Sequence, residues 1–371
     1  MLIGVPKEIK SQEYRVGLVP GSVREIIKAG GAVLIEKNAG QGIRISDGEY
    51  IAAGATIAEN AEEVYSKADM IVKVKEPQPV ECKMLREGQT LFTYLHLAPD
   101  PQQTRLLKDS GVTAIAYETV TQPNGGLPLL TPMSEVAGRL SIQAGAHCLE
   151  AAQGGTGKLL GGVPGVAAAN VLVIGAGVVG TNALRIAVGM GAEVKVMDTS
   201  LNRLRELDFQ FGPKIVTCYP TAEELERSLS VADLVIGAVL VPGASAPKVV
   251  TREMLDFMPK GSVLVDVAID QGGCFETSRP TTHQQPTYVV NDVVHYCVAN
   301  MPGAVPSTST FALNNATLPF VLKIVKKGVK DALTSDPHFL NGLNVHRGQI
   351  TYKTVANEFD YPYVPAMDAL N

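Results

Sequence analysis

The sequence predicts an α/β protein built from two doubly wound domains, and three observations lead to this prediction. Apolar runs of strand length alternate with helix-like segments along both halves of the chain. Near the middle, a glycine-rich turn stands between one such run and a helix-like segment. The chain has 371 residues, which is long for one core and fits two domains of ordinary size. Strands separated by helices favour parallel pairing.

Composition narrows the class of protein. Charged residues make up 19% of the chain and apolar residues 46%, as in folded globular proteins. The formal net charge of −5 argues against a nucleic-acid partner, which calls for a basic surface. No apolar run reaches membrane-spanning length without Gly, Pro, Asn or a charged residue, so we expect no transmembrane helix and no membrane partner.

The N-terminus and the cysteines both favour a cytoplasmic protein. The chain begins Met-Leu-Ile-Gly-Val-Pro-Lys-Glu, without the basic start and long apolar core of a signal peptide. The odd number of cysteines and the lack of a C-x-x-C pair favour a reducing compartment over disulfides or a zinc cluster. The cysteines are Cys82, Cys148, Cys218, Cys274 and Cys297.

The first 130 residues carry their own alternation of strands and helices. We expect strands at residues 2–6, 32–36, 70–74, 90–95 and 113–117. We expect helices at residues 20–29, 47–53, 60–66 and 101–109. Residues 122–131 are rich in Pro and Gly, which indicates a boundary.

The rest of the chain repeats this plan between two long helices, predicted at residues 134–153 and 307–333. We expect strands at residues 171–174, 194–197, 214–217, 234–238 and 263–267, with a last strand at 288–290. The Gly157-Lys158 pair follows a helix rather than a strand, so it is a loop and not a phosphate-binding P-loop. The tail at 348–365 is too short for a third domain and should pack on one already present.

The glycine-rich turn has the form G-x-G-x-x-G, with its glycines at Gly175, Gly177 and Gly180. A strand precedes it and a helix follows it, as in the Rossmann dinucleotide-binding motif. The first glycine allows the tight turn, the second lets backbone N–H groups approach a pyrophosphate, and the third lets the helix sit close to the strand. The pyrophosphate would rest on the helix N-terminus. The simpler interpretation is a turn that binds no ligand.

An acidic residue lies where this motif expects one. The next apolar run ends at Asp198, whose carboxylate would accept from the ribose hydroxyls of the adenosine and repel a 2′-phosphate. This favours NAD over NADP as the cofactor. Arg203 lies close enough to leave some tolerance of NADP open.

Ligands of open parallel sheets bind beyond the carboxyl ends of the strands, and this rule selects candidate residues for chemistry. Arg15 lies in the loop after the first strand, Lys75 follows the strand at 70–74, and His96 follows the strand at 90–95. In the second half, Asp270 follows the strand at 263–267 and Asn300 lies beyond the last strand.

This set suits the dehydrogenation of a small α-substituted acid. Arg15 can hold a carboxylate through two hydrogen bonds, and Lys75 can pair with the carboxylate or carbonyl oxygen. His96 can exchange protons at neutral pH. Asp270 could activate a water or orient an ammonium group.

Each of these residues also has a simpler interpretation. His96 could be a packed or surface histidine, and Lys75 a solvated strand end. Arg15 could cap a helix or pair with Glu13, and Asp270 could hydrogen-bond a turn. His147 falls within a helix and is interpreted as structural. No metal site is expected, because the remaining histidines show no ligand spacing: His283, His295, His338 and His346.

Several sequence blocks, in order along nearly the whole chain, resemble one family. They lie at residues 4–8, 13–17, 73–77, 92–98, 133–135, 161–165, 266–273 and 295–303. The family comprises alanine dehydrogenases and the NAD-binding subunits of proton-translocating transhydrogenases. The resemblance implies a Rossmann-like NAD-binding domain, residues 131–306, inserted into a Rossmann-like catalytic domain, residues 1–130 with 307–371, and joined to it by the long helices. It also implies a homohexamer.

The resemblance assigns roles to single residues. It implies that His96 and Asp270 are catalytic and that Arg15 and Lys75 bind the substrate. The residues that it places against NAD are Ser134, Gly175, Gly177, Val178, Val179, Gly180, Asp198, Arg203, Val239, Leu240, Val267, Asp270, Val298, Asn300 and Met301.

The two branches of the family differ in chemistry. A transhydrogenase subunit exchanges hydride between nucleotides and needs no substrate histidine or aspartate, whereas this chain keeps both His96 and Asp270. The resemblance therefore favours NAD-dependent oxidative deamination of L-alanine to pyruvate and ammonium, which is reversible. Two alternatives remain: a hydride-exchange subunit with a membrane partner, and an NAD-binding regulator without catalysis.

Overall fold

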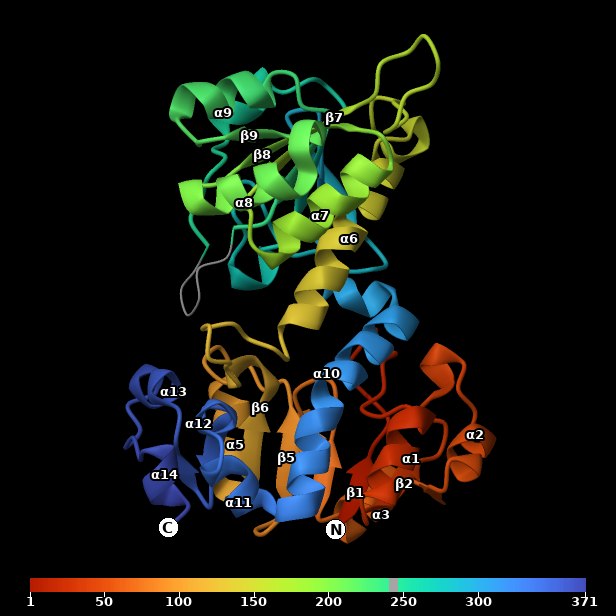
Figure 1. Cartoon of the computed structure of the whole chain (residues 1–371), viewed down its shortest axis with the longest axis vertical. Helices are drawn as coiled ribbons and strands as arrows, with labels where there is room; N and C mark the ends of the chain where they lie inside the picture. Colours follow the sequence, from red (N-terminus) through yellow and green to blue (C-terminus); the bar gives the residue numbers. More distant parts are fainter. Residues whose placement is uncertain (240–245) are drawn as a thin grey trace. The chain divides into compact units, whose positions relative to one another are not determined.

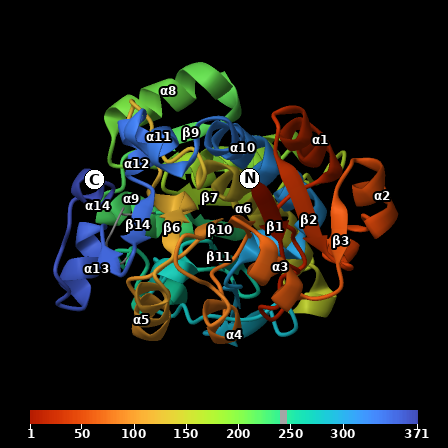
Figure 2. The same cartoon turned by 90° about the horizontal axis from the view of Figure 1, so that it is seen from below.

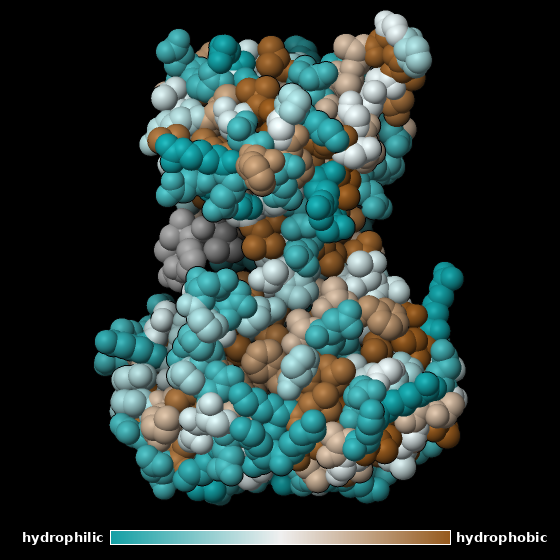
Figure 3. Space-filling view, viewed as in Figure 1, coloured by the Kyte–Doolittle hydropathy of each residue, from teal (hydrophilic) through white to brown (hydrophobic). Residues whose placement is uncertain are grey.

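The computed structural model describes residues 1–239 and 246–371. The chain forms two compact units (Figure 1): the first unit comprises residues 1–133 and 305–371, and the second unit comprises residues 134–304. Polar side chains cover much of the face shown in Figure 3, with apolar ones scattered among them. Within the described ranges, no helix is both long enough and apolar enough to cross a membrane.

Every residue of the first unit is described, and its sheet has eight strands in the order β15-β14-β6-β5-β4-β1-β2-β3. The strands are β1 (Leu2–Val5), β2 (Ala32–Glu36), β3 (Thr56–Ala58), β4 (Met70–Val72), β5 (Thr90–Thr93), β6 (Thr113–Ala116), β14 (Leu343–His346) and β15 (Gln349–Ile350). Strands β1 to β6 pair in parallel, and β14 and β15 add an antiparallel edge.

Helices cover both faces of this sheet (Figure 2). One face carries α3 (Ala61–Lys67), α4 (Pro79–Cys82), α5 (Pro101–Ser110) and α13 (Lys353–Glu358), and the other carries α1 (Pro20–Lys28), α10 (Pro306–Lys327), α11 (Val329–Thr334) and α12 (Pro337–Leu340). Two further short helices are α2 (Asp47–Ala52) and α14 (Ala366–Ala369).

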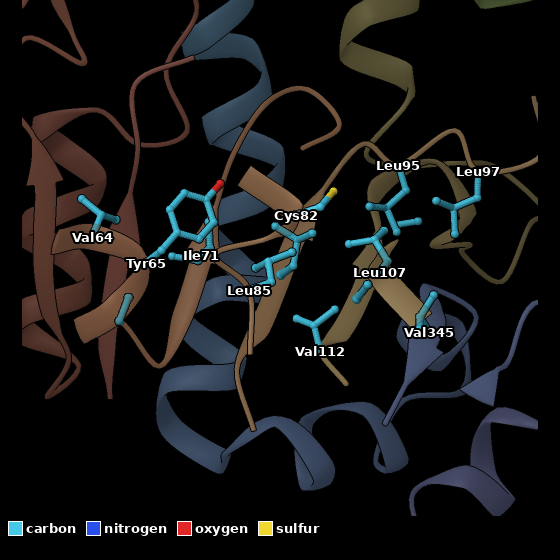
Figure 4. Packing of buried hydrophobic residues seen from close by; sticks show 14 of the residues in the cluster. Val64, Tyr65, Ile71, Cys82, Leu85, Leu95, Leu97, Leu107, Val112 and Val345 are labelled. Atoms are coloured by element: carbon cyan, nitrogen blue, oxygen red, sulfur yellow. The ribbon is translucent and has the colours of Figure 1, made fainter. Parts of the chain in front are cut away.

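The period-two alternation of strand side chains explains the two layers. Leu91 of β5 packs in the cluster with α3 and α5, where Val64, Tyr65 and Leu107 point toward the sheet (Figure 4). Its neighbour Phe92 points the other way. The ring of Phe92 meets those of Tyr117 and Phe339 edge-on, at centroid distances of 4.4 and 5.9 Å.

The sheet of the second unit has, among its described residues, seven strands in the order β12-β13-β11-β10-β7-β8-β9. They are β7 (Asn170–Ile174), β8 (Glu193–Met197), β9 (Val216–Cys218), β10 (Leu234–Gly237), β11 (Val263–Asp266), β12 (Thr287–Val290) and β13 (Val293–Tyr296). The helices are α6 (Thr131–Cys148), which begins in the first unit, α7 (Val178–Gly189), α8 (Leu201–Phe211) and α9 (Ala222–Leu229).

Both sheets follow the same doubly wound plan. In each, the chain lays down three parallel strands toward one edge, returns, and adds the next strands on the other side of the first. This is the Rossmann order 3-2-1-4-5-6, which confirms the predicted fold class. The order reverses between β1 and β4 in the first unit and between β7 and β10 in the second. These two switch points are where ligands of such folds bind.

The prediction that residues 288–290 form the last strand of the second sheet is wrong, because another strand follows them. Residues 287–290 form β12, an antiparallel edge, whereas β13 is the strand that lies parallel to β11. The two strands form a hairpin through Asn291 and Asp292, which have φ angles of 48° and 60°. Two residues with positive φ are the requirement of the tight hairpin turn, and Asn and Asp tolerate that region best after Gly.

Other boundaries also differ from the predicted ones. The strand expected at 214–217 is β9, Val216–Cys218, because Pro213 starts a short 3₁₀ helix at 212–214. The helix expected at 307–333 ends at Lys327, because Gly328 has a φ of 77°. The helix expected at 134–153 ends at Cys148, so His147 lies in its last turn, 60% exposed and 3.2 Å from Glu150. The tail packs on the first unit through β14 and β15.

His295 of β13 is a buried histidine with both ring nitrogens bonded. Nδ1 lies 2.9 Å from the carbonyl oxygen of Val293, and Nε2 lies 2.7 Å from the hydroxyl of Thr277. A carbonyl can only accept, so Nδ1 carries the proton and Nε2 accepts from Thr277. Burial lowers the pKa of His295 below its ordinary value because it disfavours the charged ring.

This pKa predicts a loss of stability in acid. Above the unfolded pKa of about 6.5 both states hold neutral His295 and the residue has no effect. As the pH falls below that value the unfolded state takes up the proton first, so the free energy of unfolding decreases, by about 1.4 kcal/mol per unit of pKa lowering. We expect His295→Gln to lose less stability than the wild type between about pH 7.5 and about pH 5.5 in urea titrations. Exposed His147→Gln is the control. Equal losses in all three proteins would contradict the prediction.

Candidate functional site

The candidate residues of the first unit leave its sheet at one edge. Arg15 follows β1, Lys75 follows β4 and His96 follows β5. Because these strands are parallel neighbours, their carboxyl ends lie side by side, so each residue begins from the edge at which open α/β sheets bind ligands.

Arg15 is held by a buried carboxylate. Its side chain is 2% exposed, with Nε 2.6 Å and Nη2 2.5 Å from the two carboxylate oxygens of Glu13. Nη1 lies 3.1 Å from Sδ of Met133. Burial alone would lower the pKa of Arg15, but the hydrogen bonds and charge of Glu13 outweigh it and raise the pKa. The pairing considered from the sequence as a simpler alternative therefore exists, and it fixes the plane of the guanidinium.

Lys75 is half-buried, and its backbone is fixed from two sides. Its N–H donates to Oε1 of Glu8 over 3.4 Å, and its carbonyl accepts from the hydroxyl of Thr93 over 2.9 Å. Glu8 comes from the loop after β1 and Thr93 from the end of β5. Residues that follow or end the strands on both sides of β4 thus fix the position of the Lys75 backbone.

His96 stands in an unusual backbone conformation at the end of β5. Its φ is 49°, a region that non-glycine residues enter only where the surroundings enforce it. Its N–H donates to Oε1 of Glu118 over 2.6 Å, and the N–H of Leu95 donates to the same carboxylate over 3.1 Å. The side chain is 45% exposed, and its ring stacks on that of Tyr94 at 5.8 Å.

Glu118 also faces the imidazole, with Oε1 3.9 Å from Nδ1 of His96. Sequence reasoning did not select it, although it directly follows β6 and obeys the same carboxyl-end rule. Tyr94 was missed as well. Burial raises the pKa of the Tyr94 hydroxyl, which donates to the carbonyl of Leu129 over 2.5 Å and stays neutral.

The glycine-rich turn of the second unit has a steric reason for glycine at 175 and at 180 but not at 177. Gly175 has a φ of 99°, which favours glycine, and a Cβ there would lie 2.6 Å from the carbonyl oxygen of Ala238. A Cβ on Gly180 would lie 1.9 Å from the carbonyl oxygen of Gly175. A Cβ on Gly177 would meet no atom within 4 Å. The protein itself therefore gives no reason for glycine at 177, which fits a cradle whose space belongs to a ligand.

Asp198 and Arg203 frame this turn. The carboxylate of Asp198 accepts from the N–H groups of Ala176 and Ser200, each over 2.7 Å. Arg203 donates from Nε to the carbonyl of Ala176 over 2.8 Å and from Nη2 to the hydroxyl of Thr181 over 2.6 Å. Its Nη1 pairs with Glu206, 2.5 Å away.

The other predicted NAD contacts lie on the elements that border the carboxyl edge of the second sheet. Ser134 is in α6, and Val178 and Val179 begin α7. Val239 follows β10, Val267 and Asp270 follow β11, and Val298, Asn300 and Met301 follow β13. Leu240 lies outside the described residues.

A buried carboxylate shapes the loop that bears Asp270. Asp266, at the end of β11, accepts from the N–H groups of Ala268, Cys274 and Phe275 over 2.9 to 3.2 Å. Burial raises its pKa, although these donors act in the opposite direction. Asp270 itself is exposed on a short 3₁₀ turn. In the described part of the chain, no three His, Cys, Asp or Glu residues are grouped as metal ligands.

Comparisons with known proteins place the chain in one family. The models for the alanine dehydrogenase/PNT N-terminal and C-terminal domains match residues 4–137 and 141–353. An alanine dehydrogenase of Halomonas elongata is 59% identical over 366 residues, 99% of either chain, and one of Mycolicibacterium smegmatis is 55% identical over the full length of both.

Solved structures agree with these sequence matches. An L-alanine dehydrogenase structure, 52% identical, matches 97% of this chain and 99% of that one with a TM-score of 0.95. A transhydrogenase from Sinorhizobium meliloti, 25% identical, matches 95% of this chain and 99% of that one with a TM-score of 0.80.

Gly177 offers a test of ligand binding that is separate from folding. Because a Cβ there meets no protein atom, Gly177→Ala should melt at the wild-type temperature, yet it should weaken NADH binding about tenfold or more by blocking the approach of a pyrophosphate. Gly189→Ala, also without a neighbour within 4 Å, is the matched control in the same helix. Binding is followed by the fluorescence of NADH. Wild-type affinity in Gly177→Ala would show that the turn is not the dinucleotide site.

Proposed function

The chain belongs to the alanine dehydrogenase/PNT family, and on that basis we propose that it catalyses the oxidative deamination of L-alanine. L-Alanine, NAD⁺ and water give pyruvate, ammonium, NADH and a proton, and the reverse reaction is the reductive amination of pyruvate. The observation that carries the proposal is His96, turned out of β5 by Glu118 at the edge where Lys75 and the buried Arg15 also emerge.

NAD is the cofactor that fits the second unit, residues 134–304, which makes up most of the nucleotide domain that we propose at residues 131–306. Gly177 leaves space for a pyrophosphate, and Asp198 is fixed against the turn to meet ribose hydroxyls. Arg203 is paired with Glu206 and with the turn itself, which supports NAD over NADP. When bound, NAD accepts the hydride that leaves Cα of alanine. The family resemblance adds the other NAD contacts given above, of which Leu240 lies outside the described residues.

Arg15 and Lys75 of the first unit bind the substrate. This unit contains the catalytic domain that we propose at residues 1–130 with 307–371. The guanidinium plane is set by Glu13, so Arg15 meets a carboxylate with little further loss of freedom. Lys75 starts from a fixed backbone and pairs with the carboxylate or carbonyl oxygen. Orientation of this kind lowers a barrier by about 7 kcal/mol or more in favourable cases.

His96 and Asp270 move the protons. The ammonium group of alanine first releases one proton to solvent, which is the proton of the overall reaction. Loss of hydride from Cα then leaves a protonated imine, to which water adds, and the carbinolamine releases ammonium. His96 takes the proton of the attacking water and returns it to the leaving nitrogen. The Glu118 carboxylate faces the ring, with Oε1 3.9 Å from Nδ1 of His96. Asp270 assists by orienting the water or the ammonium group.

Assembly and location follow from the same family resemblance. We assign a homohexamer in the cytoplasm, with L-alanine, pyruvate and ammonium as its small-molecule partners and with neither nucleic acid nor a membrane. Size-exclusion chromatography with light scattering tests the hexamer, because six chains of 39.3 kDa should elute as one species.

The likeness to a transhydrogenase supports one alternative, hydride exchange between nucleotides. The first experiment is therefore NAD reduction, followed by the near-ultraviolet absorbance of NADH, with L-alanine and then with other L- and D-amino acids. Turnover with L-alanine supports the proposal. NADH binding without turnover of any amino acid would support hydride exchange or a regulatory role instead.

His96→Ala should reduce turnover by about 10²- to 10⁴-fold, because the general acid–base group is lost. NADH binding should be unchanged, since the nucleotide site belongs to the second unit. His147→Ala is the matched control, because that histidine is exposed and pairs with Glu150 in the neighbouring turn. Steady-state kinetics and NADH titration measure the two effects. Full activity in His96→Ala would remove this residue from the mechanism.

A further inference from the structure

The two switch points of the molecule are filled differently. In the second unit the loop after the first strand of the sheet is the glycine-rich turn, which leaves open space at Gly177. In the first unit the corresponding loop, after β1, reads Pro6-Lys7-Glu8, and the buried side chain of Glu8 contacts the segment that follows β4. A carboxylate of the chain itself thus occupies the place that an anionic ligand takes in doubly wound folds.

Every oxygen of this carboxylate has a partner from the neighbouring strand. Oε1 of Glu8 accepts from the N–H of Val74 over 2.7 Å and from the N–H of Lys75 over 3.4 Å. Oε2 accepts from Nζ of Lys73 over 3.1 Å. Glu8 therefore binds the segment after β4 as a bound anion would, through the backbone N–H groups of Val74 and Lys75.

Lys73 is fully buried and also pairs with a second carboxylate, that of Glu81. Its Nζ lies 2.7 Å from Oε1 of Glu81 in α4, which also accepts from the hydroxyl of Tyr65 over 3.1 Å. Oε2 of Glu81 accepts from the N–H of Gln78 over 2.8 Å. Buried ion clusters of this kind add little net stability compared with apolar packing, so their value lies in the geometry that they fix.

The geometry fixed here is that of Lys75. Its N–H is held by Glu8 and its carbonyl by Thr93, so the residue cannot shift along β4 without breaking both contacts. We propose that Glu8 is a positioning residue for Lys75, and that Lys73 is the counterion that holds the Glu8 carboxylate in the crevice. The inference rests on the proposed function only for the role of Lys75 as a substrate ligand.

The test compares Glu8→Gln, which keeps the volume and one acceptor oxygen, with the wild type. The KM for L-alanine and for pyruvate should rise about tenfold or more, the effect expected when a hydrogen bond to a charged group is weakened. The affinity for NADH should stay within about twofold, because that site belongs to the other unit. Thr93→Val, which removes the second clamp of Lys75 without removing a charge, should shift KM in the same direction by less.

Glu36→Gln is the matched control. Glu36 accepts over 2.7 Å from the N–H of Lys7, which lies in the same loop as Glu8, but Glu36 has no hydrogen bond to Lys75. The KM of the Glu36→Gln variant should therefore equal that of the wild type. Melting temperatures and circular dichroism report whether each variant folds. If Glu8→Gln fails to fold, Thr93→Val decides the question.

Amine reactivity gives a readout that needs no turnover. The rate at which trinitrobenzenesulfonate modifies Lys75, followed by peptide mass spectrometry, should change in Glu8→Gln, while the rate for Lys10 stays constant. An unchanged Lys75 rate together with an unchanged KM would overturn the inference. If the wild type turns over no amino acid, the proposed function fails, and the modification rates still show whether Glu8 positions Lys75.

Discussion

Carboxylates that accept backbone N–H groups at the carboxyl ends of strands support the whole candidate site. Glu8, Asp198, Asp266 and Glu118 do this. A loop that leaves a parallel strand has N–H groups without a partner in the ladder, and a buried N–H without an acceptor is costly. A charged acceptor makes a shorter and stronger bond than a carbonyl does. The segments that carry Lys75, His96 and Asp270, and the glycine-rich turn, are therefore each held by an acidic side chain.

Local sequence patterns predicted some parts of the structure and missed those that depend on contacts between distant segments. Apolar runs and the glycine turn predicted the parallel strands and the doubly wound class, because both depend on neighbouring residues. The hairpin of β12 and β13 was missed, since its two-residue Asn-Asp turn is a weaker signal than Asn-Gly. The pairing of β14 with β6 joins segments more than two hundred residues apart, and a short strand carries no mark of its distant partner.

The same distinction applies to the site. The carboxyl-end rule selected Lys75 and His96, since each directly follows a recognisable strand. The rule did not reveal what holds them, because Glu8 lies 66 residues from Val74 in the sequence and Glu118 lies 22 from His96. Arg15 and Glu13 are two residues apart, so their pairing could be considered from the sequence alone. The positive φ of His96 carries no sequence signal, because it is imposed by the Glu118 carboxylate and the ring of Tyr94.

The two halves of the chain show how one topology serves two kinds of ligand. In both sheets the strand order reverses beside the first strand, between β1 and β4 in one and between β7 and β10 in the other. Both sheets therefore offer a crevice to an anion. In the second unit the crevice is lined by glycine and backbone N–H groups, which suits a large pyrophosphate. In the first, Glu8 satisfies the N–H groups from within, and Lys73 balances its charge. Under the proposed function, the cationic residues beyond this crevice, Lys75 and Arg15, bind a small carboxylate. The division of labour that we propose between the two units thus depends on the residue that stands at each switch point.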